Sequence, residues 1–457
     1  MKKLWGSRFK GKTDPLADQF SFSISYDYRL AKYDCLAGIA HAKMLGSTKI
    51  ISPKESGRIT AGLNKILKQI ERGHFKFDAK AEDIHTNIQS ALKKLIGETA
   101  DKLHTGRSRN DLIVADMKMY CIDEINSIAK LLITLQKTIV QTAKKYEGVV
   151  IPAYTHLQTA QVVLLSHFLL AYVEMIERDK GRLDDAIKRT NSMPLGSCAL
   201  SGTSLPINRQ AVAKTLKFAA VTANSIDSVS DRDFIAEALA ALAIAAMHFS
   251  RIAEDLILWS TNEFNFVAID PSLCTGSSIM PHKKNPDTLE LIRGETARLY
   301  ANLNHVLVLL KGLPLTYNRD LQLDKPALFE SVEKIKTITA LLTKTFAGLK
   351  VNRAALEKAV QSPYLYCVDI MEYLIKKGVS YRQAHDIVGT IVKECLDRGV
   401  SVSQLTQAQL KKYSPKLDLG IKKLLNPQTS VQLKKSFGST NPKLVSQQIK
   451  KWQNVLK

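Results

Sequence analysis

Long stretches of helical periodicity constrain this chain most strongly. Apolar residues recur at three- and four-residue spacing, with charged residues on the opposite face, along five segments: 126–147, 157–190, 231–261, 286–312 and 326–348. Several of these segments far exceed an ordinary globular helix, which indicates a bundle of long helices. Strand signals are weak, and Gly148–Pro152 is the best of them. The sequence therefore predicts an all-α protein built around a long central helical bundle.

Polar or broken stretches mark the ends of this bundle. Residues 102–111 form a polar loop. Residues 317–326 end in Asp324-Lys325-Pro326, where we expect a helix to start with Asp324 as its N-cap. Beyond about residue 360, glycines and prolines shorten the helical segments. We predict three regions: a mostly helical N-terminal domain over 1–111, the bundle over 112–360, and a small helical C-terminal domain over 361–457.

Composition indicates a soluble protein of a reducing compartment. The six cysteines among 457 residues are scattered, with no C-x-x-C pair, which argues against a disulfide framework or a zinc site. The basic N-terminus, Met1–Lys10, lacks the apolar core of a signal peptide. The most apolar segment, Phe234–Met247, is predicted to be a buried core helix too short to span a membrane. We therefore expect a cytoplasmic location.

The net charge of +22 raises the possibility of a polyanionic partner. Residues 409–457 carry eleven lysines and one acidic residue, Asp418. These lysines come mostly as spaced pairs without the interleaved aromatic residues of a nucleic-acid binder. We interpret them as a solvated face and expect no specific nucleic-acid partner. A positive field also attracts an anionic substrate.

The loop 276–286 is the segment most indicative of chemistry. It combines two adjacent hydroxyls, Ser277 and Ser278, with two cations, Lys283 and Lys284, and the amide of Asn285. Fixed cations and hydrogen-bond donors stabilise negative charge that develops on a carboxylate-bearing substrate. The alternative interpretation of such a composition is an ordinary polar surface loop.

A second motif, Leu103–Asp111, precedes a long helical segment. Arg107 and Arg109 flank Ser108 within it. Guanidinium groups bind carboxylates through two parallel hydrogen bonds, so the pair is a candidate clamp for a dicarboxylate. A solvated turn is the alternative interpretation.

A third motif, Tyr154–Gln161, is expected at the start of another helical segment. Its His156 can change protonation near neutral pH, as acid–base catalysis requires. Glu290, just beyond the loop 276–286, is a candidate to orient that imidazole or to stabilise its charge. The alternatives are a structural or capping histidine and a first-turn carboxylate stabilised by the helix dipole.

These motifs together resemble those of a known family. The loop 276–286 resembles the signature of the fumarase/aspartase superfamily, and Tyr317–Lys325 resembles the corresponding stretch of argininosuccinate lyases. Four further matches to the same family are Leu4–Phe9, Phe22–Asp27, Glu82–His85 and Thr105–Asp111. The resemblance spans residues 4 to about 330 and fades in the C-terminal region.

The resemblance implies a reaction and a set of residues. The reaction is the reversible β-elimination of argininosuccinate to arginine and fumarate, in arginine biosynthesis, without a metal or another cofactor. Ser277 and His156 match the catalytic residues, and Lys283 matches a lysine that stabilises the intermediate. The positions that match substrate-binding residues are Ser23, Asn110, Thr155, Asn285, Tyr317, Gln322 and Lys325. The resemblance also implies a homotetramer with a twenty-helix core, in which each active site draws on three subunits.

Several alternatives stay open on the sequence alone. Ser277 is the base and His156 the acid in one assignment, and the roles are exchanged in the other. Adenylosuccinate lyase and fumarase or aspartase share the fold, although the stretch 317–325 counts against them. Outside these enzymes, the rivals are a structural, crystallin-like protein and a polyanion-binding protein on the same fold.

Overall fold

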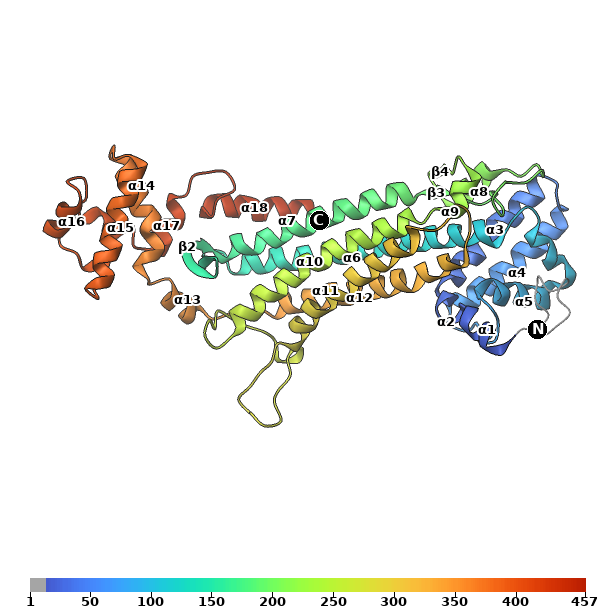
Figure 1. The fold of residues 1–457 in the computed structure, drawn as a ribbon, viewed down its shortest axis with the longest axis horizontal. Helices are drawn as coiled ribbons and strands as arrows, with labels where there is room; N and C mark the ends of the chain where they lie inside the picture. Colours follow the sequence, from blue (N-terminus) through green and yellow to red (C-terminus); the bar gives the residue numbers. More distant parts are fainter. Residues whose placement is uncertain (1–13) are drawn as a thin grey trace. The chain divides into compact units, whose positions relative to one another are not determined.

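The computed structural model describes residues 14–457, and the mostly helical fold confirms the all-α prediction (Figure 1). The matched segment Leu4–Phe9 and the basic stretch Met1–Lys10 lie outside the described residues. Five long helices correspond to the five periodic segments. They are α6 (Arg109–Lys145), α7 (Leu165–Thr190), α10 (Asp233–Ser260), α11 (Asp287–Leu310) and α12 (Asp324–Gly348).

Shorter elements precede, connect and follow the long helices. Those before or between them are α1 (Pro15–Ser21), α2 (Ile24–Asp27), α3 (Ala31–Ser47), α4 (Pro53–Glu71), α5 (Ile84–Ile96), α8 (Arg209–Leu216) and α9 (Ser225–Ser230). Those after them are α13 (Arg353–Ala359), α14 (Cys367–Lys376), α15 (Tyr381–Asp397), α16 (Gln407–Tyr413), α17 (Pro427–Leu433) and α18 (Pro442–Val455). The strands are β1 (Val150–Thr155), β2 (Gln158–Leu164), β3 (Ser192–Met193), β4 (Ala220–Val221), β5 (Val267–Ala268) and β6 (Lys350–Val351).

The described chain divides into two compact units. Unit 1 comprises residues 14–130, 179–246 and 296–336, and unit 2 comprises 131–178, 247–295 and 337–457. Each long helix contributes residues to both units. Our division into three consecutive domains therefore stays a prediction. Within unit 2, residues of α14, α15 and α16 share a hydrophobic core that includes Leu374, Ile391 and Leu410.

One periodic segment was interpreted wrongly over its first turns. Residues 157–164 were predicted to begin a helix, but Gln158–Leu164 forms β2, which pairs antiparallel with β1. Helix α7 begins only at Leu165. The β-branched residues Thr159, Val162 and Val163 favour a strand once a partner strand is available. The strand signal at Gly148–Pro152 is confirmed, because β1 starts at Val150.

The apolar segment Phe234–Met247 lies within α10, whose bounds agree with the periodic segment 231–261. This helix is 28 residues long, and one 18-residue window has a mean hydropathy of 1.5. By length and composition alone the whole helix could cross a membrane, whereas the segment Phe234–Met247 is only part of it. However, 61% of that window is buried inside the protein, as expected of a core helix.

The start of α12 differs from our prediction in a way that affects the core of unit 1. The helix begins at Asp324 itself, so this residue is not the N-cap. Its carboxylate is fully buried and accepts from Arg232 Nε at 2.5 Å and from Lys325 Nζ at 2.9 Å. Arg232 and Lys325 are each about 1% exposed. A charge-neutralising group of this kind lets two cations enter a low-dielectric interior.

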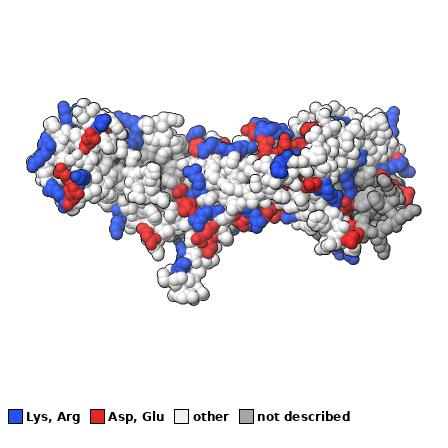
Figure 2. Space-filling view, in the orientation of Figure 1, with Lys and Arg blue, Asp and Glu red and all other residues white. Residues whose placement is uncertain are grey.

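Charged side chains are mixed on the face of the molecule that Figure 2 shows. Lys and Arg lie among Asp and Glu on this face, without a single continuous basic patch. In the C-terminal region, most lysines of residues 409–457 are exposed, in agreement with a solvated face, whereas Lys434 pairs with the buried Asp369 at 2.6 Å.

We expect Asp324→Asn to lower the free energy of unfolding by about 3–5 kcal/mol, because it leaves two buried cations without their carboxylate. Urea denaturation of both proteins measures this difference. The control is Lys188→Ala, which breaks a pair whose side chains are 72% and 54% exposed. That variant should lose less than about 1 kcal/mol. Equal losses in the two variants would contradict the role given to Asp324.

Candidate active site

The predicted site residues fall into two groups, one in each unit. Unit 1 holds Ser23, Arg109, Asn110, Tyr317, Gln322 and Lys325. Unit 2 holds Thr155, His156, Ser277, Lys283, Asn285 and Glu290. In unit 1, these residues contact segments distant in sequence, whereas the contacts of the unit 2 residues are local.

Ser23 lies beside a buried carboxylate in unit 1. Its Oγ donates to Asp27 Oδ2 at 2.6 Å, and its backbone N–H donates to the Glu82 carbonyl at 2.9 Å. Asp27 is 1% exposed and its Oδ1 has no hydrogen-bond partner. Burial raises the pKa of Asp27 to about 6. A buried carboxylate with an unused oxygen is an acceptor for a cationic or hydrogen-bonding group of a ligand.

The two arginines of the Leu103–Asp111 motif have different surroundings. The Nε and Nη1 atoms of Arg107 are buried without hydrogen-bond partners, and burial lowers its pKa. Arg107 as a whole is half-buried, like Arg109, and the clamp formed by the two arginines stays a prediction. Arg109 is 27% exposed and opens α6. Its guanidinium is held by the residues just before and within the first turn of α5: Glu82, Asp83 and Thr86.

The loop before α6 is fastened by one buried carboxylate. Asp111 Oδ1 accepts from the Ser108 N–H at 3.0 Å, and Oδ2 accepts from the N–H groups of Gly196 and Cys198 at 2.9 and 2.8 Å. The neighbouring Asn110 is half-buried, and its Nδ2 donates to the Ala199 carbonyl at 3.1 Å. Two segments of unit 1 that are far apart in sequence thus position the Asn110 amide.

The stretch 317–325 contributes polar groups with different exposure. Gln322 Nε2 donates to the Ser21 carbonyl at 2.8 Å, next to the Ser23 segment. Tyr317 is half-buried, and burial raises its pKa. Lys325 is 1% exposed, and burial lowers its pKa although Asp324 opposes that shift.

His156 lies at the tip of the hairpin in unit 2. Thr155 and Gln158 close the β1–β2 ladder, and His156 and Leu157 between them have φ of 55° and 57°. Two successive left-handed residues make a two-residue turn of type I′, which matches the twist of the strands. His156 is exposed. The expectation that His156 begins a helix was wrong, because the turn places it at the end of two strands.

Ser277 lies in the loop between α10 and α11, which projects away from the helices of unit 2 (Figure 1). Its Oγ accepts from the backbone N–H groups of Ile279 and Met280 at 3.4 and 3.1 Å. Backbone donors directed at a hydroxyl oxygen stabilise negative charge on it. The loop geometry therefore favours Ser277 as a group that can lose a proton.

The base of this loop is closed by backbone hydrogen bonds. Thr275 and Asn285 exchange two N–H···O bonds of 3.1 and 2.8 Å, and Asp287 accepts from the Thr275 hydroxyl. Lys283 and Lys284 are both exposed, and Lys284 Nζ donates to the Ile269 carbonyl at 2.7 Å. The role of Lys283 toward a substrate stays a prediction.

Glu290 does not contact the histidine that we expected it to orient. It is exposed in the first turn of α11, and no hydrogen bond or ion pair of the described residues joins it to His156. Its backbone N–H donates to the Pro286 carbonyl. Within the described chain, its position fits a first-turn carboxylate.

Sequence reasoning missed several residues that surround Ser23 and Arg109. Asp27, Glu82, Asp83, Thr86 and Arg319 were singled out only as parts of matched motifs or not at all. Arg319 Nη2 donates to Glu82 Oε1 at 3.2 Å and to the Ser21 carbonyl at 2.8 Å. The clustering of acids at Glu82–Asp83, in a chain with excess positive charge, was the available signal.

Comparison with protein families covers most of the chain. A model described as Lyase matches residues 7–300, and a model described as Argininosuccinate lyase C-terminal matches residues 364–432. The second match corrects our expectation that the resemblance fades beyond about residue 330.

Curated relatives match along nearly the whole chain. An argininosuccinate lyase of Syntrophus aciditrophicus is 46% identical over 448 residues, which cover 98% of this chain and 95% of the relative. That of Geobacter metallireducens is 45% identical over 439 residues, which cover 96% of each chain.

Solved structures of similar fold include EDDS lyase in complex with formate. It is 26% identical, has a TM-score of 0.83, and the match covers 98% of this chain and 91% of that one. A β-carboxy-cis,cis-muconate cycloisomerase from Acinetobacter calcoaceticus, 16% identical with a TM-score of 0.74 over 96% and 98% of the two chains, shares the fold. The family models, the relatives and the fold agree, and this chain belongs to the argininosuccinate lyase family of the fumarase/aspartase superfamily.

Proposed function

We propose that this protein catalyses the reversible β-elimination of argininosuccinate to arginine and fumarate, in cytoplasmic arginine biosynthesis. The relatives that match along the whole chain support the reaction. The observation in the structure that carries the chemistry is the Ser277 Oγ, which accepts from two backbone N–H groups on a loop that also bears an exposed lysine. Adding argininosuccinate to the purified protein and following fumarate by its ultraviolet absorbance tests the proposal.

The difficult step is removal of a proton from carbon next to a carboxylate. The electron pair moves into that carboxylate and forms a dianionic aci-carboxylate, which needs nearby positive charge and hydrogen-bond donors. Lys283 and Asn285 supply a cation and an amide on the same loop. The C–N bond then breaks, the guanidinium nitrogen leaves as arginine after it takes a proton, and fumarate remains.

One acid and one base serve this reaction. In the first assignment Ser277 takes the carbon proton, and His156 gives a proton to the departing nitrogen. The backbone donors at the Ser277 Oγ support this assignment, because they stabilise an alkoxide. In the second assignment, His156 is the base and Ser277 the donor. Thr155 and Glu290 complete the unit 2 group, the former beside the histidine and the latter as a charge on α11.

Unit 1 supplies groups complementary to the two ends of the substrate. Arg109 and Asn110 suit a carboxylate, since one carries a guanidinium and the other an amide donor. Ser23, with the free oxygen of Asp27 beside it, suits the cationic guanidinium end. Tyr317, Gln322 and Lys325 are the remaining predicted contacts.

We further propose a homotetramer in which neighbouring subunits complete each site. Helix α11 exposes several large apolar side chains in the single chain: Leu291 is 67% exposed, and Leu307 and Val308 are each 50% exposed. Apolar residues at this density on a long helix favour burial against another subunit. The partly exposed residues of α10, such as Ile244 and Met247, extend the apolar surface available for assembly.

Ser277→Ala should lower kcat by about 10²–10⁴-fold, because it removes the proton-transfer group while leaving the backbone of the loop intact. The melting temperature should stay within about 2 °C of the parent protein, since the side chain lies in a projecting loop. Steady-state kinetics and thermal denaturation measure these effects. The control is Ser278→Ala at the neighbouring hydroxyl, which should keep most activity. Comparable loss in both variants would contradict the assignment of Ser277.

Mixed assembly distinguishes shared sites from sites within one chain. His156→Asn should also be inactive, and asparagine tolerates the left-handed backbone of the turn. When Ser277→Ala and His156→Asn chains are unfolded partly and reassembled together, some hybrid sites should carry neither lesion and regain activity. Each variant reassembled alone is the control. Native mass spectrometry shows whether hybrids form. If they form but stay inactive, Ser277 and His156 of each site come from one chain.

A further inference from the structure

The segment Glu82–Thr86 contacts two of the predicted substrate-binding residues in unit 1. Arg109 Nη1 lies 3.2 Å from Glu82 Oε2 and 3.1 Å from Asp83 Oδ2, and Arg109 Nη2 donates to Thr86 Oγ1 at 2.9 Å. The Glu82 carbonyl accepts from the Ser23 N–H. Asp83 also caps α5, because its side chain accepts from the Thr86 N–H at 2.8 Å. Movement of this segment would therefore displace Ser23 and Arg109 together.

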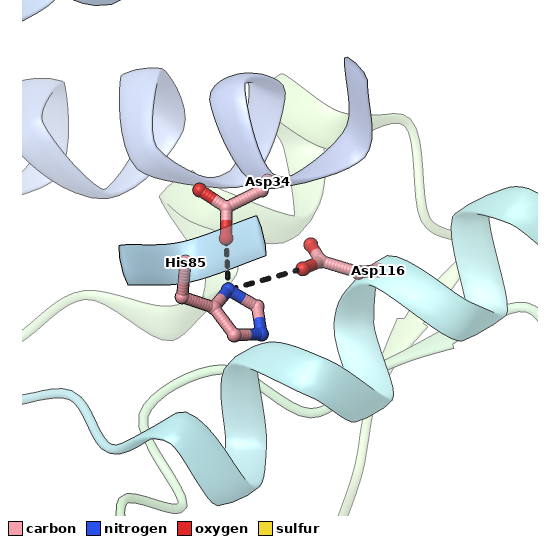
Figure 3. Close-up of side chains that lie close together, drawn as sticks. All are labelled: Asp34, His85 and Asp116. Carbon is pink, nitrogen blue, oxygen red and sulfur yellow. Dashed lines mark hydrogen bonds and ion pairs between the residues drawn. The ribbon is translucent and has the colours of Figure 1, made fainter. Parts of the chain in front are cut away.

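His85 of the same segment points into the interior of unit 1. Figure 3 shows its Nδ1 directed at Asp34 of α3 and Asp116 of α6. The ring pairs closely with Asp34 and lies 3.9 Å from Asp116 Oδ2. The three residues are 3%, 4% and 0% exposed, so water does not screen their charges.

The charges of this cluster favour a protonated imidazole. Burial alone would lower the pKa of His85, but pairing with Asp34, helped by Asp83 and Asp116, raises it to about 9. Asp116 has no hydrogen-bond partner for either oxygen, and burial raises its pKa. The other charged groups that act on Asp116 are Arg107 and Asp27. The His85 ring is thus held mainly by one carboxylate of another helix, and its Nε2 is buried without a hydrogen-bond partner.

We propose that His85 is a positioning residue for substrate binding, because its pairing with Asp34 holds the segment 82–86 in place against Arg109 and Ser23. The segment is then fixed at two points, to α3 through His85 and to α6 through Arg109. A guanidinium held by three groups of the segment 82–86 binds a carboxylate well only while that segment keeps its place. This inference rests on the proposed function, since it takes Arg109 to bind the substrate.

The first test is a double-mutant cycle between Asp34 and Arg109. Asp34→Asn should raise KM about tenfold and change kcat by less than about threefold, because binding geometry is lost while the proton-transfer groups of unit 2 are untouched. In an Arg109→Lys background, the same Asp34→Asn change should raise KM by less than about twofold. If Asp34→Asn does not fold, His85→Gln takes its place in the cycle.

The matched control is Asp369→Asn. Asp369 is a 2% exposed carboxylate of unit 2 that pairs with Lys434 and accepts from Ser430. It should lower the melting temperature without changing KM, and its effects should add to those of Arg109→Lys. Additive effects of Asp34→Asn and Arg109→Lys on KM would overturn the positioning role. Unchanged KM in Arg109→Lys alone would overturn it as well, whereas fumarate formation by the parent protein would still uphold the proposed function.

The second test uses pH. A group whose pKa is raised on folding contributes stability below its unfolded pKa of about 6.5, and the contribution is lost as pH rises through the folded pKa. The difference in melting temperature between the parent protein and His85→Gln should therefore be largest near pH 6 and shrink through about pH 9. A constant difference across this range would contradict a charged His85. If the purified protein retains a stoichiometric metal and loses activity on chelation, the cluster is a metal site and the proposed ion pair is wrong.

Discussion

Buried charge has to be neutralised by groups within a few ångströms, and this requirement organises unit 1. The interior of this unit contains Arg232 with Asp324 and Lys325, and Lys118 with Asp231. Each ion is expensive to remove from water and is tolerated only with a partner in good geometry. The partners come from different parts of the chain, so satisfying them fixes how the helices of unit 1 pack. The residues that bind substrate in our proposal are attached to this charged framework.

In our proposal, unit 1 binds the substrate and unit 2 transfers protons, and the two units hold the residues for these tasks in different ways. In unit 1, Ser23 and Arg109 are held by side-chain and backbone bonds to one segment, and their geometry depends on packing. In unit 2, His156 and Ser277 lie on a hairpin turn and a projecting loop, where backbone geometry alone sets their direction. This division suits an elimination. The rigid binding residues orient the C–N bond of the substrate, and the proton-transfer residues then break it.

Periodicity sufficed to predict the long helices, because a 3.6-residue pattern sustained over the length of α10 or α12 does not fit a strand or a loop. It failed at Gln158–Leu164, where a strand with apolar residues on both faces has no distinctive spacing. The turn there contains His156 and Leu157, whereas the sequence signal that predicts a type I′ turn is an Asn-Gly pair. The motifs located most of the proposed site. They could not show that two nitrogens of Arg107 are buried without partners while the Arg109 guanidinium is bound by residues 82–86, because that difference depends on residues distant in sequence.

The left-handed backbone at residue 156 restricts which residue types can occupy this position. The backbone at this position favours glycine, asparagine, aspartate or histidine, since a β-branched or bulky residue is strained at positive φ. The proton transfer that we propose for this residue independently favours histidine. Only histidine belongs to both sets. The position therefore has no conservative replacement: asparagine preserves the shape of the turn without the proton, and any other side chain that titrates near neutral pH would strain the hairpin.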